Sequence, residues 1–542
     1  MTGDEILDAM EHIDPDLIAD ADAPTKKRRK PYWFAAVAAL LVLAIGIGVV
    51  LGGNGISGTT GPIQIGSHIV NSTTTPTNPI HQTFPTLTTP TTPITFPTLP
   101  TPSGITPPEL LLLANLAAAP QYPQMVQRPN EKDYEDYKSY QTARDAWADF
   151  KRNWNQQYAL TWAETQSLDD YFHRSSLEFL SGDGNQVYSP LNVYMALAML
   201  AETTDGNSRQ EILDLLGAPS MEFLRYQAQK IWCATYTADG TAESLLANSL
   251  WLDDAFTFHD KTVQTLAQQY FASVFHGDLG TEEMNEQLHS WLDIHTGGLL
   301  EDQIQGLELS PETVFALAST LYFRARWSSE FDPSENTTDS FYAINRSYPA
   351  EFMHCTASEY FWGKHFSATR LHLDGTSTGF MWLIRPNEGY TPQDVLQDGD
   401  WLKCVQQNYY QDANGHYVFE WTNQSYNYKV NIHLPKFDIS AKQDLIDGMK
   451  NLGLQDIFDW TTSDFTPLCS DVPIYVNQID HVVRVAIDEE GVTAAAYTVI
   501  AGDGSGSSGD CEEIDFILNR PFLFVITSRD GLPLFTGIVN EP

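Results

Sequence analysis

The sequence predicts an α+β protein with large mixed β-sheets, preceded by a long segment that lies outside this fold. From about residue 108 onward the chain is rich in Leu, Ile, Val, Phe, Tyr and Trp, which is enough apolar area for one large core. In that part, runs with helical spacing dominate early and long β-rich runs dominate late, with some interleaving. Residues 1–107 instead contain an apolar run and a Thr/Pro-rich run.

The apolar run, YWFAAVAALLVLAIGIGVVL, is uncharged and long enough to cross a bilayer as a helix. The basic cluster KKRRK precedes it directly, and such flanks stay in the cytoplasm. We therefore expect a cytoplasmic tail over residues 1–30, a transmembrane helix over 31–52, and a single-pass cell-membrane protein whose remainder is extracellular. A cleaved signal peptide is the alternative, but the stretch before the basic cluster is long and acidic, and no A-x-A site follows.

Residues 53–107 predict an extended stalk, because proline removes backbone donors and threonine offers little apolar area. In polyproline II form it would reach on the order of 150 Å. The globular part follows over residues 108–542, divided into an N-terminal extension, 108–167, and a core, 168–542.

Charge and cysteine content exclude several classes of function. The net charge of -40 argues against a nucleic-acid-binding surface, which needs clustered Lys and Arg. The five cysteines are widely spaced, odd in number and free of a CxxC pair, so we expect isolated thiols, no metal site and no cofactor. They are Cys233, Cys355, Cys404, Cys469 and Cys511.

Three tempting motifs have simpler explanations. GSGSSG, residues 504–509, satisfies GxGxxG, but the acidic residues after it would repel a phosphate. His481 has no GxSxG elbow to serve and is expected to be a structural hydrogen-bonding histidine. The segment MHC, residues 353–355, lacks a second ligand pair and is expected to pack in the core.

The early elements are predicted helices. We expect a short helix between the prolines of residues 107–120, helical structure over 133–171, and an amphipathic helix over 168–180. Ser189 followed by Pro190 marks the start of another helix, as a cap followed by a residue suited to the first turn.

The later elements are predicted strands. They cover residues 314–327, 428–439 with an interruption at Pro435, 481–488, 521–527 and 533–539. No repeat with a period of 20 to 50 residues is present.

Seven stretches in a fixed order resemble the serpin family, and together they span about residues 168–542. The resemblance implies three β-sheets, eight or nine helices, an exposed reactive loop, a monomer, and a protease inhibitor that has no catalytic residues and is not an enzyme. The stretches are VYSPLNVYMALAML, GNSRQEILDLLG, NEQLHSWLDIHTGGLLEDQI, FALASTLYFRARWSSEFDP, VNIHLPKFDISAKQDLIDGMKNLGLQDIFD, HVVRVAIDEEGVTAAAYTV and LNRPFLFVITSRDGLPLFTGIVNEP.

By this resemblance, DEEGVTAAAYTVIAGDGSGSSGDCEEIDF contains the reactive loop, which follows the fifth strand of the largest sheet. Inhibitory serpins present this loop as protease bait and insert its cleaved N-terminal part into the sheet. The hinge residues implied here are Glu489, Glu490, Gly491, Val492, Thr493, Ala494, Ala495, Ala496, Tyr497 and Thr498.

The residues of the hinge suit a strand that enters the middle of a sheet. Alternate side chains face opposite ways, and one face from Val492 to Ile500 carries only small or apolar residues. Tyr497, on the other face, is the bulkiest residue of the segment and departs most from this small-residue pattern. No proline interrupts residues 491–509, so every backbone donor is available, and Gly491 allows the chain to swing.

Counting along the loop as in the family places the reactive bond between Ser505 and Gly506; cleavage after Asp503 or Gly504 is the alternative. A small residue at this bond favours an extracellular protease with a shallow primary pocket, elastase-like or subtilisin-like. The protease serine, or alternatively a cysteine, would attack the Ser505 carbonyl, and insertion would distort the acyl-enzyme before water releases it.

The family's sheet-opening region is altered here. In the family pattern, serines stand on the helix and an asparagine stands on the strand. Here Asn192 stands on the helix and Ser319 on the strand, so the amide and the hydroxyl have changed places. With Ser189 and His481 they are predicted to form a buried polar network, which must be satisfied to be tolerated. The predicted function is a surface-tethered suicide inhibitor. The alternative, suggested by the exchange and by Tyr497, is a non-inhibitory binding or structural module at the cell surface.

Overall fold

The computed structural model describes residues 38–43 and 115–542, except for 121, 124, 239–241, 305, 374–378, 408, 412–416, 427 and 493–511. The chain divides into two compact units, Met1–Phe34 and Ala35–Pro542. All described residues belong to the second unit. The predicted tail and stalk, and most of the predicted membrane segment, lie outside them.

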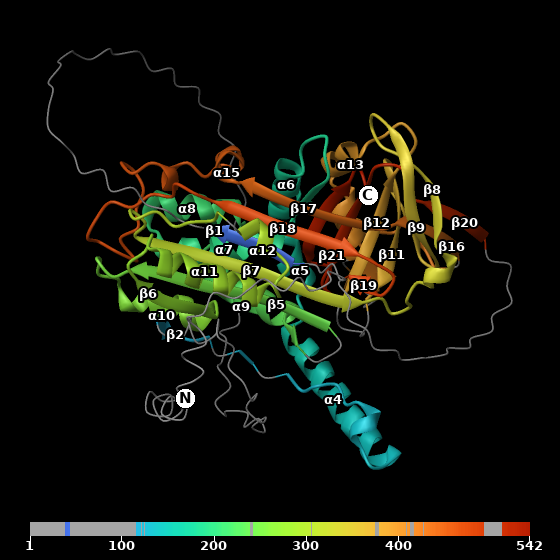
Figure 1. Ribbon diagram of the computed structural model, residues 1–542, viewed down its shortest axis with the longest axis horizontal. Helices are drawn as coiled ribbons and strands as arrows, with labels where there is room; N and C mark the ends of the chain where they lie inside the picture. The colour runs from blue at the N-terminus through green and yellow to red at the C-terminus, as the bar shows by residue number, and fades with distance from the viewer. Residues whose placement is uncertain are drawn as a thin grey trace, which may run out of the picture. The chain divides into compact units, whose positions relative to one another are not determined.

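The largest sheet has nine strands in the order β1-β18-β19-β7-β5-β6-β2, with β17 paired to β18 and β4 paired to β5 (Figure 1). Strand β5 is antiparallel to β7 and parallel to β6. The strands are β1 Ala38–Leu43, β2 Leu116–Ala118, β4 Thr237–Ala238, β5 Ala242–Asp253, β6 Ala272–Gly277, β7 Phe315–Arg326, β17 Phe437–Asp444, β18 Asp480–Ile487 and β19 Gly491–Val492.

The described residues form two further sheets and a small hairpin. A seven-stranded sheet has the order β15-β10-β11-β12-β21-β22-β3, a four-stranded sheet has the order β20-β16-β9-β8, and β13 pairs with β14. The strands are β3 Gln186–Tyr188, β8 Thr337–Tyr342, β9 Ser347–Ala357, β10 Tyr360–Trp362, β11 Phe366–His372, β12 Phe380–Pro386, β13 Tyr409–Gln411, β14 Tyr417–Phe419, β15 Gln424–Ser425, β16 Tyr428–Pro435, β20 Glu512–Ile517, β21 Phe522–Thr527 and β22 Pro533–Val539.

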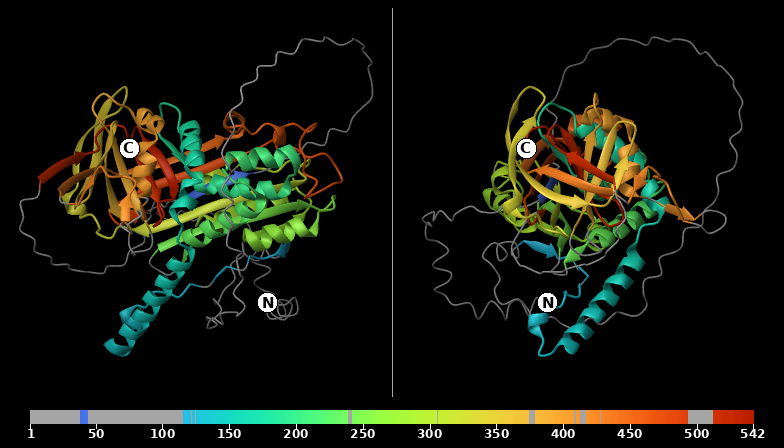
Figure 2. Two further views of the ribbon diagram at one scale, coloured as in Figure 1. Left: turned by 180° about the vertical axis from the view of Figure 1, so that it is seen from behind. Right: turned by 90° about the vertical axis from the view of Figure 1, so that its right-hand side faces the viewer.

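Helices lie mostly in the first half of the described chain, as the sequence predicts. Figure 2 shows that α4 extends away from the rest of the fold. The helices are α4 Tyr137–Tyr158, α5 Trp162–Gln166, α6 Asp169–Phe179, α7 Pro190–Thr203, α8 Gly206–Leu215, α9 Met221–Thr235, α10 Asp260–Gln269, α11 Glu282–His295, α12 Glu301–Ile304, α13 Pro392–Asp398, α14 Asp400–Gln406 and α15 Ile446–Leu452, with short 3-10 turns η1 Glu131–Asp133, η2 Pro333–Glu335 and η3 Asp456–Phe458.

These elements confirm the α+β class with three main sheets. The predicted strands near residues 314–327, 481–488, 521–527 and 533–539 correspond to β7, β18, β21 and β22. Pro435 does more than interrupt a strand. It ends β16 in the four-stranded sheet, and β17 begins two residues later in the largest sheet.

The expected helix over residues 107–120 is wrong for the part that is described. Leu116–Ala118 form β2, which pairs with Phe275 and Val274 of β6. A short apolar run fits the edge of an apolar sheet as well as it fits a helix, and sequence periodicity does not separate the two.

Six residues of the predicted membrane span, Ala38–Leu43, form β1 and pair with β18 and β7. A strand differs from the helix expected over residues 31–52. Among the described residues, no helix is both long enough and apolar enough to cross a membrane. An uncharged run satisfies its backbone equally by a helical ladder or by two sheet neighbours, so its composition fits both conformations.

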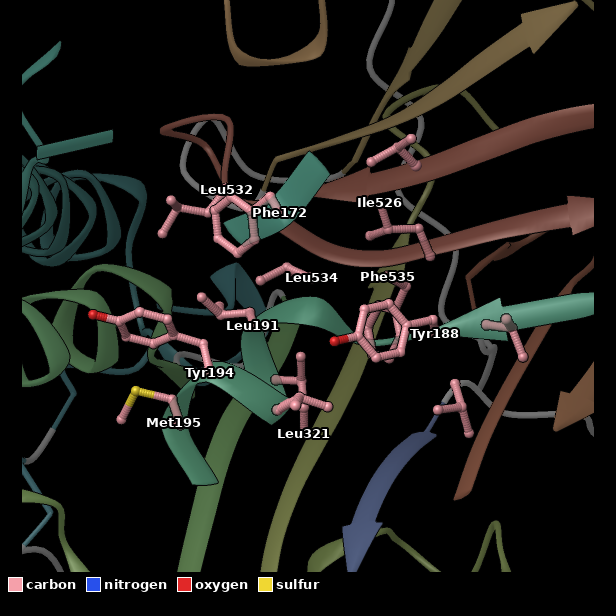
Figure 3. Packing of buried hydrophobic residues seen from close by; sticks show 14 of the residues in the cluster. Phe172, Tyr188, Leu191, Tyr194, Met195, Leu321, Ile526, Leu532, Leu534 and Phe535 are labelled. Carbon is pink, nitrogen blue, oxygen red and sulfur yellow. The ribbon is translucent and has the colours of Figure 1, made fainter. Parts of the chain in front are cut away.

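The core is organised around α7, which is buried over its whole length. Figure 3 shows the packing around its first turns, where Leu191 and Tyr194 of the helix lie among Leu321 of β7 and Leu534 and Phe535 of β22. The helix therefore fixes the largest sheet relative to the seven-stranded sheet.

Candidate functional site

Strands β7 and β18 flank a gap in the largest sheet, and in the described chain they are joined only through β19 and β1. After β18 the chain turns back and enters one end of this gap as β19. Val492 pairs with Ile487 of β18 and with Ala325 of β7, and both pairings are antiparallel. The first two hinge residues after Glu490 thus already lie between the two strands.

Strand β1 occupies the other end of the same gap. Ala38 lies opposite Tyr322 and Arg484, and β1 ends with Leu43 opposite Leu317 of β7. Continuing the register of β19 from Val492 opposite Ala325 would bring residue 495 to Tyr322 and residue 500 to Leu317. These are the positions that β1 holds, in the same chain direction. The gap therefore accepts an extended strand in the register that an inserted hinge requires.

A tight turn formed by Asp488 directs the chain into the gap. Its Oδ1 accepts hydrogen bonds from the backbone N–H groups of Glu490 (2.9 Å) and Gly491 (3.1 Å). A Cβ at Gly491 would lie 2.4 Å from the Ala325 carbonyl oxygen, so the close approach to β7 requires glycine. The Trp327 indole N–H donates to the Asp488 carbonyl at 2.8 Å, which anchors the turn to the end of β7.

A cluster of charged groups holds the start of the hinge. The Lys436 ammonium lies 2.6 Å from Glu489 and 2.9 Å from Glu351, and the Asn336 amide donates to both carboxylates. Burial raises the pKa of Glu489, but the hydrogen bonds from Lys436 and Asn336 outweigh burial and keep this pKa below its ordinary value. Glu489 is therefore an anion that ties the hinge to the junction between β16 and β17.

The predicted polar residues gather at the first turn of α7. Ser189 occupies the N-cap position, yet its hydroxyl donates to the Leu534 carbonyl (2.7 Å) rather than to the helix. Its backbone N–H donates to His481 Nε2 of β18 at 3.1 Å. Because Nε2 accepts, the neutral ring carries its proton on Nδ1, which is buried without a hydrogen-bond partner in the described structure. Burial lowers the pKa of His481 to about 3.

The other half of the network joins α7 to β7. The Asn192 amide donates to the Ser319 carbonyl at 3.3 Å, and the Ser319 hydroxyl lies 2.6 Å from Asn192 Oδ1 and 2.8 Å from Asn248 Oδ1. A hydroxyl has one proton, so Ser319 donates to one of these oxygens at a time. Asn248 of β5 also donates to the Tyr270 carbonyl at 2.7 Å.

Sequence reasoning missed Asn248, and the available signal was an amide between the apolar residues of Ala242–Asp253, a strand that also carries Glu243, Ser244, Ser249 and Asp253. It also missed the charged cluster around Glu489, because Asn336, Glu351 and Lys436 lie far away in the chain. The four predicted polar residues lie at the first turn of α7 as two hydrogen-bonded pairs, with no hydrogen bond between the pairs in the described structure. One helix turn links β18, through Ser189 and His481, to β7, through Asn192 and Ser319. Their role in opening the sheet stays a prediction.

The reactive bond and six of the ten hinge residues are not among the described residues. Thr493 to Thr498, Ser505, Gly506 and Cys511 lie outside the described residues. The four cysteines inside them are free thiols. Within the described chain, no group of three or more His, Cys, Asp or Glu side chains is arranged to hold a metal ion. Of the segment 353–355, which was expected to pack in the core, Met353 is buried, whereas His354 and Cys355 are half-buried.

Comparison with known proteins agrees with this architecture. A family model described as "Serpin (serine protease inhibitor)" matches residues 170–542. A serine protease inhibitor of Cyanea capillata is 26% identical over 385 residues, covering 68% of this chain and 95% of the relative. Neuroserpin of Homo sapiens is 26% identical over 374 residues, covering 66% and 87%.

Solved structures show the same fold. The thermophilic serpin tengpin in its native state has a TM-score of 0.59 at 21% identity, covering 69% of this chain and 93% of the solved chain. The serpin AtSerpin1 of Arabidopsis, in a native stressed conformation, has a TM-score of 0.58 at 22% identity, covering 70% and 98%. Both likenesses concern the fold.

Proposed function

The chain belongs to the serpin family, and from that premise we propose that it is a suicide inhibitor of extracellular proteases, tethered to the cell surface. The observation that carries the proposal is the position of β19 between β7 and β18, at the end of the gap that β1 leaves free. The hinge already enters this gap at Gly491 and Val492, antiparallel to both neighbours. Further insertion needs no change of strand direction.

The protease supplies the catalytic chemistry. Its nucleophile attacks the Ser505 carbonyl, the bond to Gly506 breaks, and the new amino terminus leaves with the C-terminal part of the loop. The acyl-linked hinge then extends β19 along the gap and carries the protease with it. Small residues from Ala494 to Ala496 enter between packed strands with little steric resistance, whereas a charge there would cost several kcal/mol.

The target class follows from the reactive bond. Gly504 and Ser505 present almost no side-chain volume, which suits a shallow primary pocket, elastase-like or subtilisin-like, and gives a trypsin-like pocket no cation to bind. A serine protease is the main candidate, and a cysteine protease would form the equivalent thioester.

Surface tethering is supported by the apolar run behind a basic cluster and by the Thr/Pro-rich stalk that follows. Anchoring places residues 38–43 in the bilayer, so β1 must then leave the sheet. Withdrawal of β1 would vacate the positions that the loop needs. In this arrangement the membrane-bound state is the state in which the gap is open to the loop.

The experiment is to incubate the full chain, in detergent micelles, with a panel of elastase-like, subtilisin-like and trypsin-like proteases. We expect a covalent adduct that survives boiling in SDS with a small-pocket protease, and mass spectrometry should locate the new C-terminus at Ser505. Cleavage by every reactive protease without any adduct would remove the inhibitory function.

A second function is favoured by one observation, the presence of β1 in the gap. If β1 stays there, the loop has no place to insert, and the chain is a non-inhibitory binding or structural module. Heating separates the two functions. An inhibitor gains thermal stability when its loop is cut and inserted, whereas a module with a filled gap melts at the same temperature before and after cutting.

A further inference from the structure

Three aromatic side chains, one exposed and two half-buried, form a cluster beside the strand that follows the reactive loop. Tyr360 and Trp362 belong to β10, and Tyr428 is the first residue of β16. The Tyr360 ring stacks on Trp362 with centroids 6.0 Å apart and meets Tyr428 edge-on at 5.5 Å. We call these three residues the aromatic rim.

The aromatic rim adjoins the end of the reactive loop. Tyr428 pairs in register with Glu512, the first residue of β20, and residue 511 before it is the last of the undescribed loop segment. Ser505 precedes Glu512 by seven residues, so the reactive bond lies within about 25 Å of the start of β20. A protease bound at this bond therefore comes within reach of β20 and of the rim beside it.

The rim is rigidly supported. Phe361, between Tyr360 and Trp362, is fully buried, and β10 is paired on both sides, with β11 and with β15. Trp362 nevertheless leaves 38% of its surface exposed. A tryptophan fixed by a buried neighbour and stacked on a tyrosine has little conformational freedom left to lose on binding. Such preorganised aromatics are the residues that dominate protein interfaces.

Charge next to the rim indicates what it would bind. Glu512 and Glu513 are exposed at the start of β20, and Lys429 neutralises Glu513 across a 3.3 Å ion pair. Glu512 is the acidic group paired with Tyr428. Ring faces beside a carboxylate favour a cation on an aliphatic stem, because the ring quadrupole attracts the charge and the stem covers the ring.

We propose that the aromatic rim docks the body of the target protease, and that this protease presents Arg or Lys side chains beside its active-site cleft. The proposal rests on the proposed function, because it assumes that a protease engages the reactive loop. It adds a determinant of partner choice that is separate from the reactive bond. The loop selects the primary pocket, and the rim selects the surface around it.

The test compares Trp362→Ala, Trp362→Phe and Trp460→Ala in the full chain. Trp460 is a matched control because it is 52% exposed and follows η3, which packs against α8 rather than against β16 or β20. For each protease of the panel, the second-order rate constant of loop reaction is measured, whether the product is an adduct or a cleaved chain. Binding to the same protease with its nucleophile replaced by alanine is measured in parallel.

We expect Trp362→Ala to lower the rate constant and the affinity at least tenfold for at least one reactive protease, because truncation of an aromatic hot spot weakens binding by about thirtyfold or more. Trp362→Phe should keep most of the second-order rate constant, and Trp460→Ala should keep all of it. Thermal unfolding should be the same in all variants. Equal rates for Trp362→Ala and the unchanged chain with every reactive protease would overturn the proposal. The proposal would also be overturned if Trp362→Ala changed only the self-association of the chain in sedimentation, or if no protease of the panel attacked the chain. Cleavage that the variant slows, without any adduct, supports the rim and removes only the inhibitory function.

Discussion

Acidification should lower the free energy of unfolding, because His481 is buried as a neutral acceptor between α7 and β18. Its pKa is about 3 in the folded chain, against about 6.5 in an unfolded one. The folded pKa is lowered, so the unfolded state binds the proton first as pH falls. Stability is therefore unaffected well above pH 6.5 and declines as pH falls from 6.5 toward 3. At pH 5 these two pKa values correspond to a loss of about 2 kcal/mol.

The matched variant is His481→Gln, whose amide oxygen can still accept the Ser189 N–H but does not titrate. Urea unfolding midpoints of both proteins are compared at pH 8 and pH 5. Carboxylates titrate in both proteins, so the difference between them isolates the histidine. We expect the unchanged chain to lose about 2 kcal/mol more than the variant over this interval. An equal loss in the two proteins would refute the assignment of His481 as a buried neutral acceptor.

Three further perturbations test the hinge. Gly491→Ala places a methyl group 2.4 Å from the Ala325 carbonyl oxygen and should destabilise the intact chain by about 1–3 kcal/mol. Thermal unfolding measures this loss. An unchanged Tm would show that the turn is not held against β7. Lys436→Ala leaves Glu489 beside Glu351 without a cation and should release the hinge. A small-pocket protease should therefore cut the loop faster. An unchanged cleavage rate would show that the ion pair does not restrain the loop. Ala496→Arg puts a charge on the inserted face, so cleavage should continue while the SDS-stable adduct falls at least tenfold; full adduct yield would mean that this residue does not enter the sheet.

The sequence was informative where a pattern is local or where the family order of motifs is intact. Such signals predict the strands around residues 314–327 and 481–488 and the start of α7 at Pro190. They also predict the four polar residues near the first turn of α7. Residues 116–118 form a strand instead of the expected helix, because short apolar runs fit both structures and only the neighbouring β6 decides.

Long-range contacts account for the rest. The cluster around Glu489 contains Asn336, just before β8, Glu351 of β9, and Lys436, between β16 and β17. No local sequence pattern relates these residues. Asn248 became recognisable only when β5 was seen beside β7. The pairing of Ala38–Leu43 with β7 and β18 is of the same kind, since an apolar run carries no information about which partner satisfies its backbone.

The most direct test of the central claim is the melting temperature of the full chain, in micelles that retain its apolar run, before and after one cut in the reactive loop. We expect a large rise in Tm, because the freed segment completes the ladder between β7 and β18. If both forms melt at one temperature, the loop has not entered the sheet, and the trapping mechanism is contradicted.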